Sequence, residues 1–538
     1  MTDVLIVGAG PTGLTLACDL ARRGVAVRVV DRSPQHPRSS RAKGPNPRSL
    51  EVLEDLGVVR EVFDAGSAPL PMRKYRDGVP VADADPYADS APTPDTPYDR
   101  GRLIAQWRLE EILRDRLLSH GVRVTTGTEV VGLDQDGDGV TVSYADGSSA
   151  PARYVVGCDG AHSRVRKLLG IPFDGETDEE QVMVCGDVEI TPGVLDRGIW
   201  HQWFDADGAV ILCPVPGSGT GWWFQAGPER DPSGAPLAPS LDGFRRLFAR
   251  HTRLPGDHLT EATLLSTYRV NVRMARRFRA GRVFLAGDAA HVHAIAGGLG
   301  MNTGIQDSYN LGWKLAQVLR GRSGPGLLDT YEEERMPVAA WTLDTTSERL
   351  RATLEAIRRP GGGLDSAVTP ETAGLDRGYR WSSLAAPGAD GVLRSGDRAP
   401  DAPCHDAATG APTRLFRAFA GPHITVLGFG PATEDTLRRA RAAHGEAVRT
   451  CRVYGAGAPA AETAAAGPDA LHDRDGLARA AYGAAAGTVV VIRPDNHVGL
   501  IAGAGGHDAV HRYLHVLDGA ARPDATSAEG MVDGAPKG

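Results

Sequence analysis

Residues 3–31 read DVLIVGAGPTGLTLACDLARRGVAVRVVD, and this stretch decides the fold of the N-terminal part of the chain. VLIV is a short run of apolar, mostly β-branched residues, which predicts a buried strand. A GxGxxG pattern follows at once, and the apolar residues after it recur at helical spacing up to Gly24, a typical C-terminal cap. A second apolar run, AVRVV, ends on Asp31. This order predicts a βαβ unit that binds a dinucleotide.

Each part of the pattern has a physical role in binding a dinucleotide. One glycine makes the tight turn, one lets the backbone approach the pyrophosphate, and one lets the helix pack closely on the strand. The helix N-terminus faces the phosphates, and the terminal acid accepts a ribose hydroxyl. The pattern alone does not distinguish FAD from NAD. The contacts that it predicts are Gly8, Gly10, Pro11, Thr12, Gly13, Asp31 and Arg32.

Composition argues against several other classes of protein. The chain has 538 residues, of which 41% are hydrophobic and 23% charged, as in a globular protein. A net charge of −8 and the lack of a dense Lys/Arg tract argue against nucleic-acid binding. No apolar run reaches the roughly 18 residues of a membrane span, and no signal peptide is recognisable, so we expect a cytoplasmic protein. Six scattered cysteines without a CxxC pair predict reduced thiols and no metal site.

Two later segments repeat the order of a strand followed by a turn with glycine and aspartate. In YVVGCDGAHSRVRKLLG (154–170), Asp159 lies at the turn and Ser163 is placed to cap the next helix. RVFLAGD (282–288) leads into a glycine-rich loop, and an amphipathic helix is predicted over 303–319. Because glycine loses the most backbone freedom on folding, such a loop needs a reason to be held in place.

Taken together, GxGxxG, DGxxSxVR and GDAAH…GGxGMNxGIQD resemble, in this order, the three signatures of the class A flavoprotein monooxygenases, the para-hydroxybenzoate hydroxylase-like enzymes. RAKGPNPRSLEVLEDLG (41–57) is similar to the corresponding element of the subgroup that acts on aromatic polyketides, rifamycin-type antibiotics and phenols. The resemblance implies an α/β fold: a Rossmann-like FAD-binding domain of the GR2 type, an interleaved β-sheet substrate domain and a C-terminal thioredoxin-like domain.

The resemblance also implies which residues contact FAD. Asp288 would hydrogen-bond the ribityl chain, and the N–H groups from Gly298 to Asn302 would face the pyrimidine end of the flavin. A reduced flavin is negatively charged, and a helix N-terminus stabilises an anion by about 0.3–1 kcal/mol. Gln106 would reach the ribose-phosphate part, and Arg41 would either touch the cofactor or be a solvated loop charge. Further implied contacts are Gly287, Gly300, Met301 and Asp159, which could instead be a turn aspartate.

The glycine-rich loop departs from the family at Ala294 and Ile295, where two prolines are common. Proline fixes φ at about −65°, so their loss should loosen the loop or reshape the pocket wall, which puts typical aromatic hydroxylation in question. His293 is a candidate acid or base, because histidine titrates near neutral pH, or it is only a polar loop residue. We expect Ile295, the other candidate near the flavin, to set pocket shape. His291 follows the family pattern and should be structural.

Residues 171–270 contain strand-like patches and a helix around LDGFRRLFARH, which predicts a sheet that covers the flavin. Large aromatic residues there are candidates to line a pocket for a flat substrate, although most such residues belong to cores. The candidates for the pocket wall are Trp203, Phe204, Trp223, Phe224, Tyr268, Ala294, Ile295 and Gly297. No catalytic side chain stands out with certainty, as expected where the cofactor supplies the chemistry.

These patterns divide the chain into four parts. They are a discontinuous FAD-binding domain (1–75, 101–170 and 271–350), a substrate-binding sheet domain (76–100 and 171–270), a helix and linker (351–397), and a C-terminal domain (398–538). Within the third part, RRPGGGLDSAVTPETAG (358–374) reads as a linker. The last part resembles the thioredoxin-like domain of many such hydroxylases. Cys404 lacks a second cysteine beside it, so we expect a packing or dimer role and no disulfide exchange.

The resemblance implies an FAD-dependent monooxygenase that uses NAD(P)H and O₂ to hydroxylate a polycyclic aromatic, polyketide-type substrate through a flavin C4a-hydroperoxide. NAD(P)H would bind transiently as a co-substrate, with NADPH and NADH both open. One alternative is a Baeyer–Villiger reaction or oxidative rearrangement of a quinone-like polyketide by the same flavin chemistry. Another is a flavin oxidase or reductase without oxygen insertion. The expected partners are the aromatic substrate and O₂, with no nucleic acid or membrane, in a monomer or homodimer.

Overall fold

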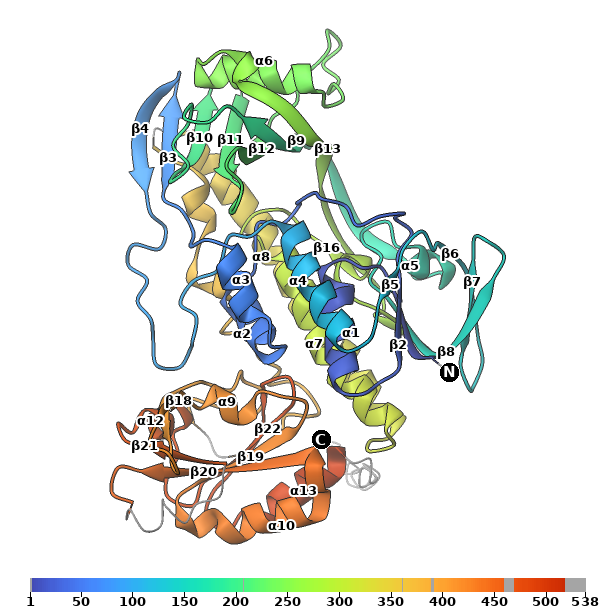
Figure 1. Ribbon diagram of the computed structural model, residues 1–538, viewed down its shortest axis with the longest axis vertical. Coiled ribbons are helices and arrows are strands. Elements are labelled where there is room, and N and C mark those ends of the chain that lie inside the picture. Colours follow the sequence, from blue (N-terminus) through green and yellow to red (C-terminus); the bar gives the residue numbers. More distant parts are fainter. Residues whose placement is uncertain (1, 207, 360, 389–390, 459–468, 518–538) are drawn as a thin grey trace, which may run out of the picture.

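The computed structural model describes residues 2–206, 208–359, 361–388, 391–458 and 469–517 (Figure 1). Within these residues the strands form three sheets. Figure 1 shows one sheet in each of three bodies, stacked along the long axis of the molecule: a roof, an N-terminal domain in the middle and a C-terminal domain below.

The N-terminal domain is built on a parallel sheet in the order β5-β2-β1-β8-β15, with β1 at its centre. Helix α1 packs between α4 and α7 and so covers this sheet. The elements of the N-terminal domain are β1 (Thr2–Val7), α1 (Pro11–Arg22), β2 (Val27–Val30), α2 (Pro47–Asp55), α3 (Val59–Ala65), α4 (Gln106–Ser119), β5 (Val124–Thr125), β6 (Val130–Gln135), β7 (Val140–Tyr144), β8 (Ser149–Gly157), α5 (Arg164–Leu168), β14 (Arg279–Ala280), β15 (Val283–Leu285) and α7 (Gly300–Leu319). The predicted βαβ unit is confirmed: β1, α1 and β2 follow in order, and β1 pairs in parallel with β2.

The second sheet, which we call the roof sheet, has the order β16-β13-β9-β12-β11-β10-β3-β4. Its strands are β3 (Met72–Arg76), β4 (Val79–Ala84), β9 (Phe173–Ile190), β10 (Trp200–Asp205), β11 (Gly208–Pro214), β12 (Gly221–Ala226), β13 (Leu259–Ala275) and β16 (His291–Val292). Helix α6 (Leu241–Thr252) covers its outer face, where Phe224 and Phe244 stack with ring centres 4.4 Å apart. The predicted strands and helix of residues 171–270 are present. The expected boundary after residue 75 falls inside β3, because Met72–Arg76 pairs with β10.

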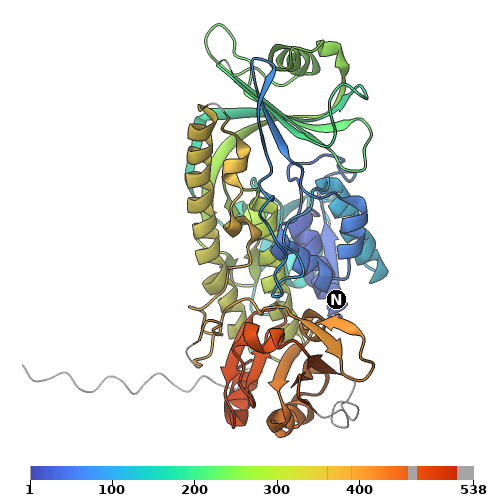
Figure 2. The ribbon, with the colours of Figure 1, turned by 90° about the vertical axis from the view of Figure 1, so that its left-hand side faces the viewer.

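Helix α8 (Asp329–Ile357) runs along one side of the molecule from the N-terminal domain to the roof sheet (Figure 2). The residues after it are not the free linker that their composition suggests. Lys74 Nζ pairs with the Asp365 carboxylate at 2.8 Å, and the Leu364 N–H donates to Gln202 Oε1 at 2.9 Å. Segment 361–375 is therefore fixed against β3 and β10, and it forms part of a wall described below.

The C-terminal domain has the sheet order β18-β17-β21-β20-β19-β22-β23. Its elements are β17 (Pro403–Asp406), β18 (Pro412–Arg414), α9 (Phe416–Phe419), β19 (Ile424–Phe429), α10 (Glu434–His444), β20 (Val448–Gly455), β21 (Ala470–Asp473), α12 (Leu477–Tyr482), β22 (Val489–Ile492), β23 (Val498–Ala502) and α13 (His507–Leu517). Residues 459–468 and 518–538 of the predicted domain lie outside the described residues. Cys404 is buried and free, and burial raises the pKa of its thiol. A thioredoxin-like fold stays a prediction.

Buried charges join the C-terminal domain to the N-terminal domain. The turn between β22 and β23 carries Arg493, which donates to both carboxylate oxygens of Glu334 on α8 at 2.6 and 2.9 Å. Asp495 in the same turn accepts a hydrogen bond from Trp313 Nε1 on α7 at 3.1 Å. These side chains are almost completely buried, so the two domains share one polar core.

Candidate functional site

A cavity of about 1470 Å³ lies between the N-terminal domain, the roof sheet and the segment after α8. Its wall contains the glycine turn after β1, residues 40–47, the turn at 158–162, the loop 292–302 and the inner face of the roof sheet. Ordinary small-molecule pockets measure about 300–1,000 Å³, so this cavity has room for a large cofactor together with a second molecule.

The glycine turn forms one end of this cavity. Gly8 has φ +105°, and a Cβ there would lie 2.3 Å from the Cys158 carbonyl oxygen. A Cβ on Gly13 would lie 2.0 Å from the Gly8 carbonyl oxygen, so strand and helix approach too closely for a side chain. At Gly10 no atom lies within 4 Å of the Cβ position, and the residue lines the cavity beside Pro11 and Thr12. The backbone is therefore open to a phosphate group at Gly10 and tightly packed at the other two glycines.

Asp31 binds the glycine turn. Its carboxylate accepts hydrogen bonds from the N–H groups of Ala9 and Ser33, both at 2.8 Å. Among the described residues the cavity wall includes the neighbouring Arg32 and not Asp31. A carboxylate has about four lone-pair positions, so Asp31 keeps the capacity to accept a ribose hydroxyl. That contact stays a prediction.

Gln106, at the start of α4, holds the backbone that carries Arg41. Its side-chain oxygen accepts from the N–H groups of Arg41 and Ala42 at 3.2 and 3.1 Å, and its nitrogen donates to Glu110 at 2.9 Å. Burial raises the pKa of Glu110 to about 7. Both Gln106 and Arg41 line the cavity, and Arg41 is exposed in it. Their contact with a cofactor stays a prediction, whereas the role of Gln106 in fixing residues 41–42 is visible.

Asp159 lines the cavity, but its carboxylate serves the N-terminus of α5. It accepts from the Ser163 hydroxyl at 2.5 Å and from the N–H groups of Arg164 and Val165 at 2.6 and 3.1 Å. Ser163 in turn caps the helix by accepting from Arg166 N–H at 3.0 Å, as predicted. The geometry therefore gives Asp159 the role of a turn and cap residue, and a cofactor contact would have to come from its remaining lone pairs.

Asp288 and Asp307, close in sequence, occupy opposite environments. Asp288 is exposed to the cavity, and no hydrogen bond of its carboxylate is found within the described part of the chain. The surrounding protein raises the pKa of that carboxyl by desolvation, while His291 and Arg41 act in the opposite direction. An unpartnered carboxylate that faces a cavity is suited to accept hydrogen bonds from the hydroxyls of a ligand.

Asp307, which sequence reasoning did not single out, holds the turn that presents Asp288. Its oxygens accept from His291 Nε2 at 2.7 Å, Gly287 N–H at 3.0 Å and Arg335 Nε at 2.7 Å. These partners, Arg335 foremost, keep the pKa of the buried Asp307 carboxyl well below its usual value against the effect of burial. His291 is fully buried in this network, as its predicted structural role requires.

Helix α7 begins in the cavity wall. Gly298, Gly300, Met301 and Asn302 all line the cavity, and the N-terminus of α7 has no side-chain cap. Among the described residues no acceptor is found for the N–H groups of residues 300–302. The Asn302 side chain binds the neighbouring loops: it accepts from Asn46 N–H and donates to the Gly298 carbonyl oxygen, both at 2.8 Å. A fixed helix N-terminus with free donors can stabilise a negatively charged ligand.

The loop that carries Ala294 and Ile295 is tied to the roof sheet by Tyr268 on β13. The Tyr268 hydroxyl donates to the His293 carbonyl oxygen at 3.3 Å and accepts from the Ile295 N–H. These bonds hold the loop where the family commonly has prolines. Burial lowers the pKa of His293 to about 3, so its ring is neutral near pH 7 and cannot donate a proton as an imidazolium. We therefore describe His293 as a polar wall residue.

The structure divides the aromatic candidates between cavity and core. Phe204, Trp223 and Tyr268 line the cavity, as do Ala294, Ile295 and Gly297. Trp203 does not: it is buried on the outer side of the roof sheet and stacks on Tyr75 with ring centres 4.6 Å apart. The Phe224 ring packs with Phe244 of α6 on that same side, so only its backbone region borders the cavity. Alternation along the strands explains both corrections, because neighbouring side chains point to opposite faces.

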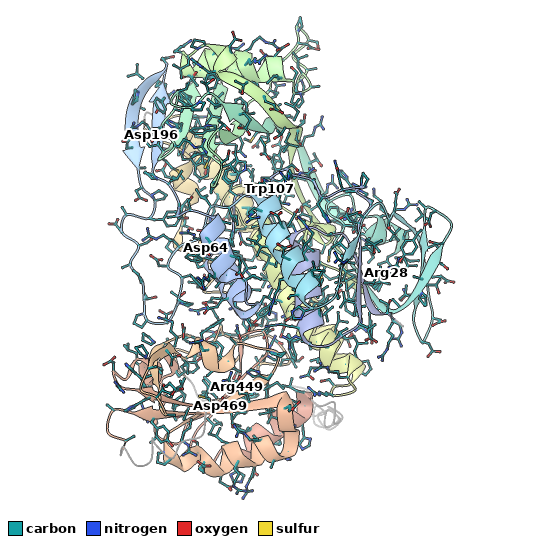
Figure 3. All side chains as sticks on the ribbon, in the orientation of Figure 1. Arg28, Asp64, Trp107, Asp196, Arg449 and Asp469 are labelled. Atoms are coloured by element: carbon teal, nitrogen blue, oxygen red, sulfur yellow. The ribbon has the colours of Figure 1, made fainter. Side chains whose placement is uncertain are left out.

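Two groups of wall residues were missed by sequence reasoning. One consists of residues at the end of α8 and in segment 361–375, where glycine and small polar residues resemble those of a linker. The other is Lys43, which extends below the roof sheet near Trp200 and Trp223. Trp107 of α4, labelled in Figure 3, packs against the same small cluster, where the N-terminal domain meets the roof sheet.

No helix among the described residues is long and apolar enough to span a membrane. In the same part of the chain, no group of three or more histidine, cysteine or acidic side chains is arranged to hold a metal ion.

Comparisons with known proteins agree with this geometry. The FAD binding domain family matches residues 1–346. A flavin-dependent monooxygenase of Mycobacteroides abscessus is 42% identical over 440 residues, which cover 79% of this chain and 88% of that protein. A rifampicin monooxygenase of Streptomyces venezuelae is 39% identical over 363 residues, or 65% of this chain and 71% of that protein.

A solved structure extends the similarity to nearly the whole chain. The ternary complex of aklavinone-11 hydroxylase with FAD and aklavinone superimposes with a TM-score of 0.81 at 29% sequence identity. The match covers 96% of this chain and 99% of that one, so it includes the roof sheet and the C-terminal domain as well as the glycine turn.

Proposed function

The chain belongs to the FAD binding domain family and is an FAD-dependent monooxygenase, and from this premise we propose that it hydroxylates a polycyclic aromatic substrate of the polyketide type with NAD(P)H and O₂. In the balanced reaction, one oxygen atom of O₂ enters the substrate, the other leaves as water, and NAD(P)H supplies the two electrons. The observation that carries the substrate class is the size of the cavity, about 1470 Å³, together with the aromatic residues of its roof.

The described residues fit FAD. The open backbone at Gly10 suits the pyrophosphate, and the unpartnered Asp288 carboxylate suits the hydroxyls of the ribityl chain. The free N–H groups at residues 300–302 suit the flavin ring, especially when it is negatively charged. Arg32, Arg41 and Gln106 would border the remaining parts of the cofactor. When bound and reduced by NAD(P)H, FAD supplies the activated oxygen.

The residues of this chain would position the substrate and exclude water. Tyr268 borders the cavity from the roof sheet with part of its ring exposed, and Phe204 and Trp223 border it with small exposed areas. Residues at the end of α8 and in segment 361–375 close another side. Tyr268 also fixes the loop at Ala294 and Ile295, so the wall next to the cofactor keeps its shape without proline. His293 is neutral near pH 7, so it cannot act in this wall as an imidazolium acid.

We further propose that the protein acts in the cytoplasm, as a monomer or homodimer without a nucleic-acid or membrane partner. In support, the chain is acidic overall, with a net charge of −8. The C-terminal domain would be a packing unit of thioredoxin-like type, since its one cysteine near the expected redox position is buried and unpaired. Light scattering after size-exclusion chromatography measures the oligomeric state.

The experiment that tests the function is a screen of NADPH and NADH oxidation by the FAD-loaded protein against aklavinone, anhydrotetracycline, rifampicin and smaller polycyclic phenols. We expect at least one of them to stimulate NAD(P)H oxidation and to gain one oxygen atom. NMR of the product separates hydroxylation from a Baeyer–Villiger product of the same mass. Failure to take up FAD, or oxidation that yields only hydrogen peroxide with every compound, would contradict the proposal.

A further inference from the structure

Lys43 places a cation at the junction of the cofactor side and the substrate side of the cavity. Its backbone is part of the segment that Gln106 holds, and its carbonyl oxygen accepts from Ile104 N–H at 2.9 Å. Its side chain extends up to the roof sheet. There the Nζ atom lies 5.5 Å from the ring centre of Trp200 and 5.8 Å from that of Trp223.

The Lys43 ammonium has no anionic partner. Within the described part of the chain it forms no hydrogen bond and no ion pair, although protein surrounds it and burial lowers its pKa. The nearest titratable groups are Cys213, Cys185 and Asp187, and none of them forms a hydrogen bond or ion pair with Lys43. Burial raises the pKa of both thiols, so they are neutral near pH 7, and the Asp187 carboxylate accepts a hydrogen bond from Ser40 N–H.

The two fully buried lysines of the described chain are paired. Lys74 contacts the Asp365 carboxylate at 2.8 Å, and Lys314 contacts Glu334 at 2.6 Å. An unpaired buried charge is costly, and two aromatic faces offset only part of the lost hydration. Lys43 is half-buried in the cavity wall and, unlike Lys74 and Lys314, has no carboxylate partner among the described residues, which points to a partner that arrives with a ligand.

The ammonium can reach such a ligand. Lys43 lines the cavity, and its unpartnered Nζ atom is accessible from it. The indole N–H groups of Trp200 and Trp223 also lack a partner, but they are buried and inaccessible. The half-buried indole of Trp200 offers apolar surface on which a flat molecule can lie, whereas Trp223 is almost completely buried. A flat aromatic ligand with one anionic oxygen at its edge would match both features together.

We propose that Lys43 binds an anionic oxygen of the aromatic substrate, so that the enzyme selects polycyclic phenols or enols in their ionised form. This inference rests on the proposed function and narrows its substrate class. A bond between an ammonium and a phenolate is charge-assisted and stronger than a neutral hydrogen bond. An ionised oxygen also donates electron density to its ring, which favours the insertion of an electrophilic oxygen atom beside or opposite it.

The test measures how tightly two probes with the same anthraquinone ring system bind to the oxidised FAD-loaded protein in the absence of NAD(P)H. Alizarin carries acidic phenols and turns red on ionisation, whereas 1,2-dimethoxyanthraquinone cannot ionise. At a pH where free alizarin is mainly neutral, we expect the wild type to bind it in the red form and at least about tenfold more tightly than the ether. Lys43→Met should abolish the red form and this preference, and Lys43→Arg should retain both.

The matched control is Lys167→Met, the same substitution at an exposed lysine of α5, which should behave as the wild type. Equal binding of the two probes by the wild type, lack of binding of either, or an unchanged preference in Lys43→Met would overturn the inference. FAD content of each variant is measured in parallel. If FAD uptake itself fails, the proposed function fails; if FAD is bound but the preference is absent, only the inference about Lys43 fails.

Discussion

At the scale of single residues, Asp288 and Asp307 show what a motif can and cannot assign. Both carboxylates lie in the same signature, yet one faces the cavity without a protein partner and the other is buried among three donors. A carboxylate exposed to a cavity contributes little to the stability of the empty protein, but it stabilises the complex with a ligand that donates hydrogen bonds to it. The two residues should therefore separate cofactor affinity from stability.

For Asp288→Asn we expect an FAD dissociation constant about 10–100-fold higher, because hydrogen bonds to a charged group contribute about 1.5–3 kcal/mol. The thermal unfolding midpoint of the apoprotein should stay the same or rise slightly, since no protein contact is lost. Flavin fluorescence on titration of apoprotein gives the affinity. An unchanged affinity would show that the carboxylate does not contact the cofactor.

For Asp307→Asn we expect the opposite balance. The substitution leaves Arg335 without its carboxylate in a buried site, which typically costs about 3–5 kcal/mol. The unfolding midpoint of the apoprotein should fall steeply, and FAD affinity should fall as a consequence. Asp329→Asn is the control, because the Asp329 pair with Arg279 is exposed and such pairs contribute about 0–1 kcal/mol. Equal effects of the two substitutions would contradict the role of Asp307.

The roles of single residues could be predicted from the sequence where a short local pattern determines the geometry. The roles of Gly8, Gly10 and Gly13 follow from their spacing, and the structure shows the close approaches that the spacing requires. They could not be predicted where the contact partner lies far along the chain. Arg335 is 28 residues from Asp307, and Lys43 meets Trp200 only through the pairing of the roof strands, so no local pattern marks either residue.

At the scale of elements, the start of α7 is the feature on which cofactor binding depends. Gly298 has φ +63°, and its Cβ position has no protein atom within 4 Å because it faces the cavity. Gly321, beyond the other end of the same helix, has φ +66° and is equally free of neighbours. The two glycines impose the same backbone cost on alanine but differ in what lies beside them.

We expect Gly298→Ala and Gly321→Ala to destabilise the apoprotein equally, by about 1–2 kcal/mol for a left-handed alanine. Only Gly298→Ala should also weaken FAD binding, by about tenfold or more, since its methyl group occupies space next to the helix N-terminus. Thermal unfolding of apoprotein and FAD titration of both variants provide the comparison. Parallel losses of FAD affinity would mean that the effect is one of helix stability.

The loop before α7 should depend on Tyr268 for its shape. Tyr268→Phe removes the hydroxyl that contacts His293 and Ile295, so we expect a larger share of NAD(P)H to be oxidised without product. Ile295→Pro removes the N–H donor of the same contact and should alter turnover in the same direction. Tyr75→Phe is the control, because its hydroxyl bonds His201 at 2.8 Å and its ring stacks on the outward-facing Trp203. Unchanged coupling in Tyr268→Phe would contradict this role.

Sequence patterns predicted most elements and missed two assignments for physical reasons. Several strands of the roof sheet, such as β11 and β12, are apolar on both faces, so they could be located, but the inward face could not be chosen, as Trp203 shows for β10. Segment 358–374 is rich in glycine, proline and small polar residues, a composition that suits a linker and a cavity wall equally. Only its contacts with Lys74 and Gln202 distinguish the two.

At the scale of the whole molecule, the C-terminal domain is held by charges that the sequence presents as an exposed turn. RPDNH (493–497) has the composition of a surface turn, yet all five of its residues are buried. Arg493 meets Glu334, a partner 159 residues away, and Glu334 also binds Lys314 on α7. Because this network couples the domain to the two long helices that border the cavity, its loss should destabilise the molecule while the cofactor contacts stay intact.

The last prediction concerns Arg493→Met and its dependence on pH. Arg493 holds the pKa of Glu334 below its ordinary value of 4.5 against the effect of burial. A carboxyl with a lowered folded-state pKa stabilises the fold above its unfolded pKa, and this contribution is lost as the pH falls through the folded-state value. The variant should therefore unfold at a much lower temperature than the wild type near pH 7, corresponding to about 3–5 kcal/mol, with an unchanged flavin spectrum. The difference should shrink as the pH falls below about 4.5.

Arg449→Met is the control: it removes the more exposed pair with Asp469, labelled in Figure 3, and should unfold at nearly the same temperature as the wild type at every pH. A constant difference for Arg493→Met down to pH values near 3 would mean that the buried pair with Glu334 is not what joins the two domains.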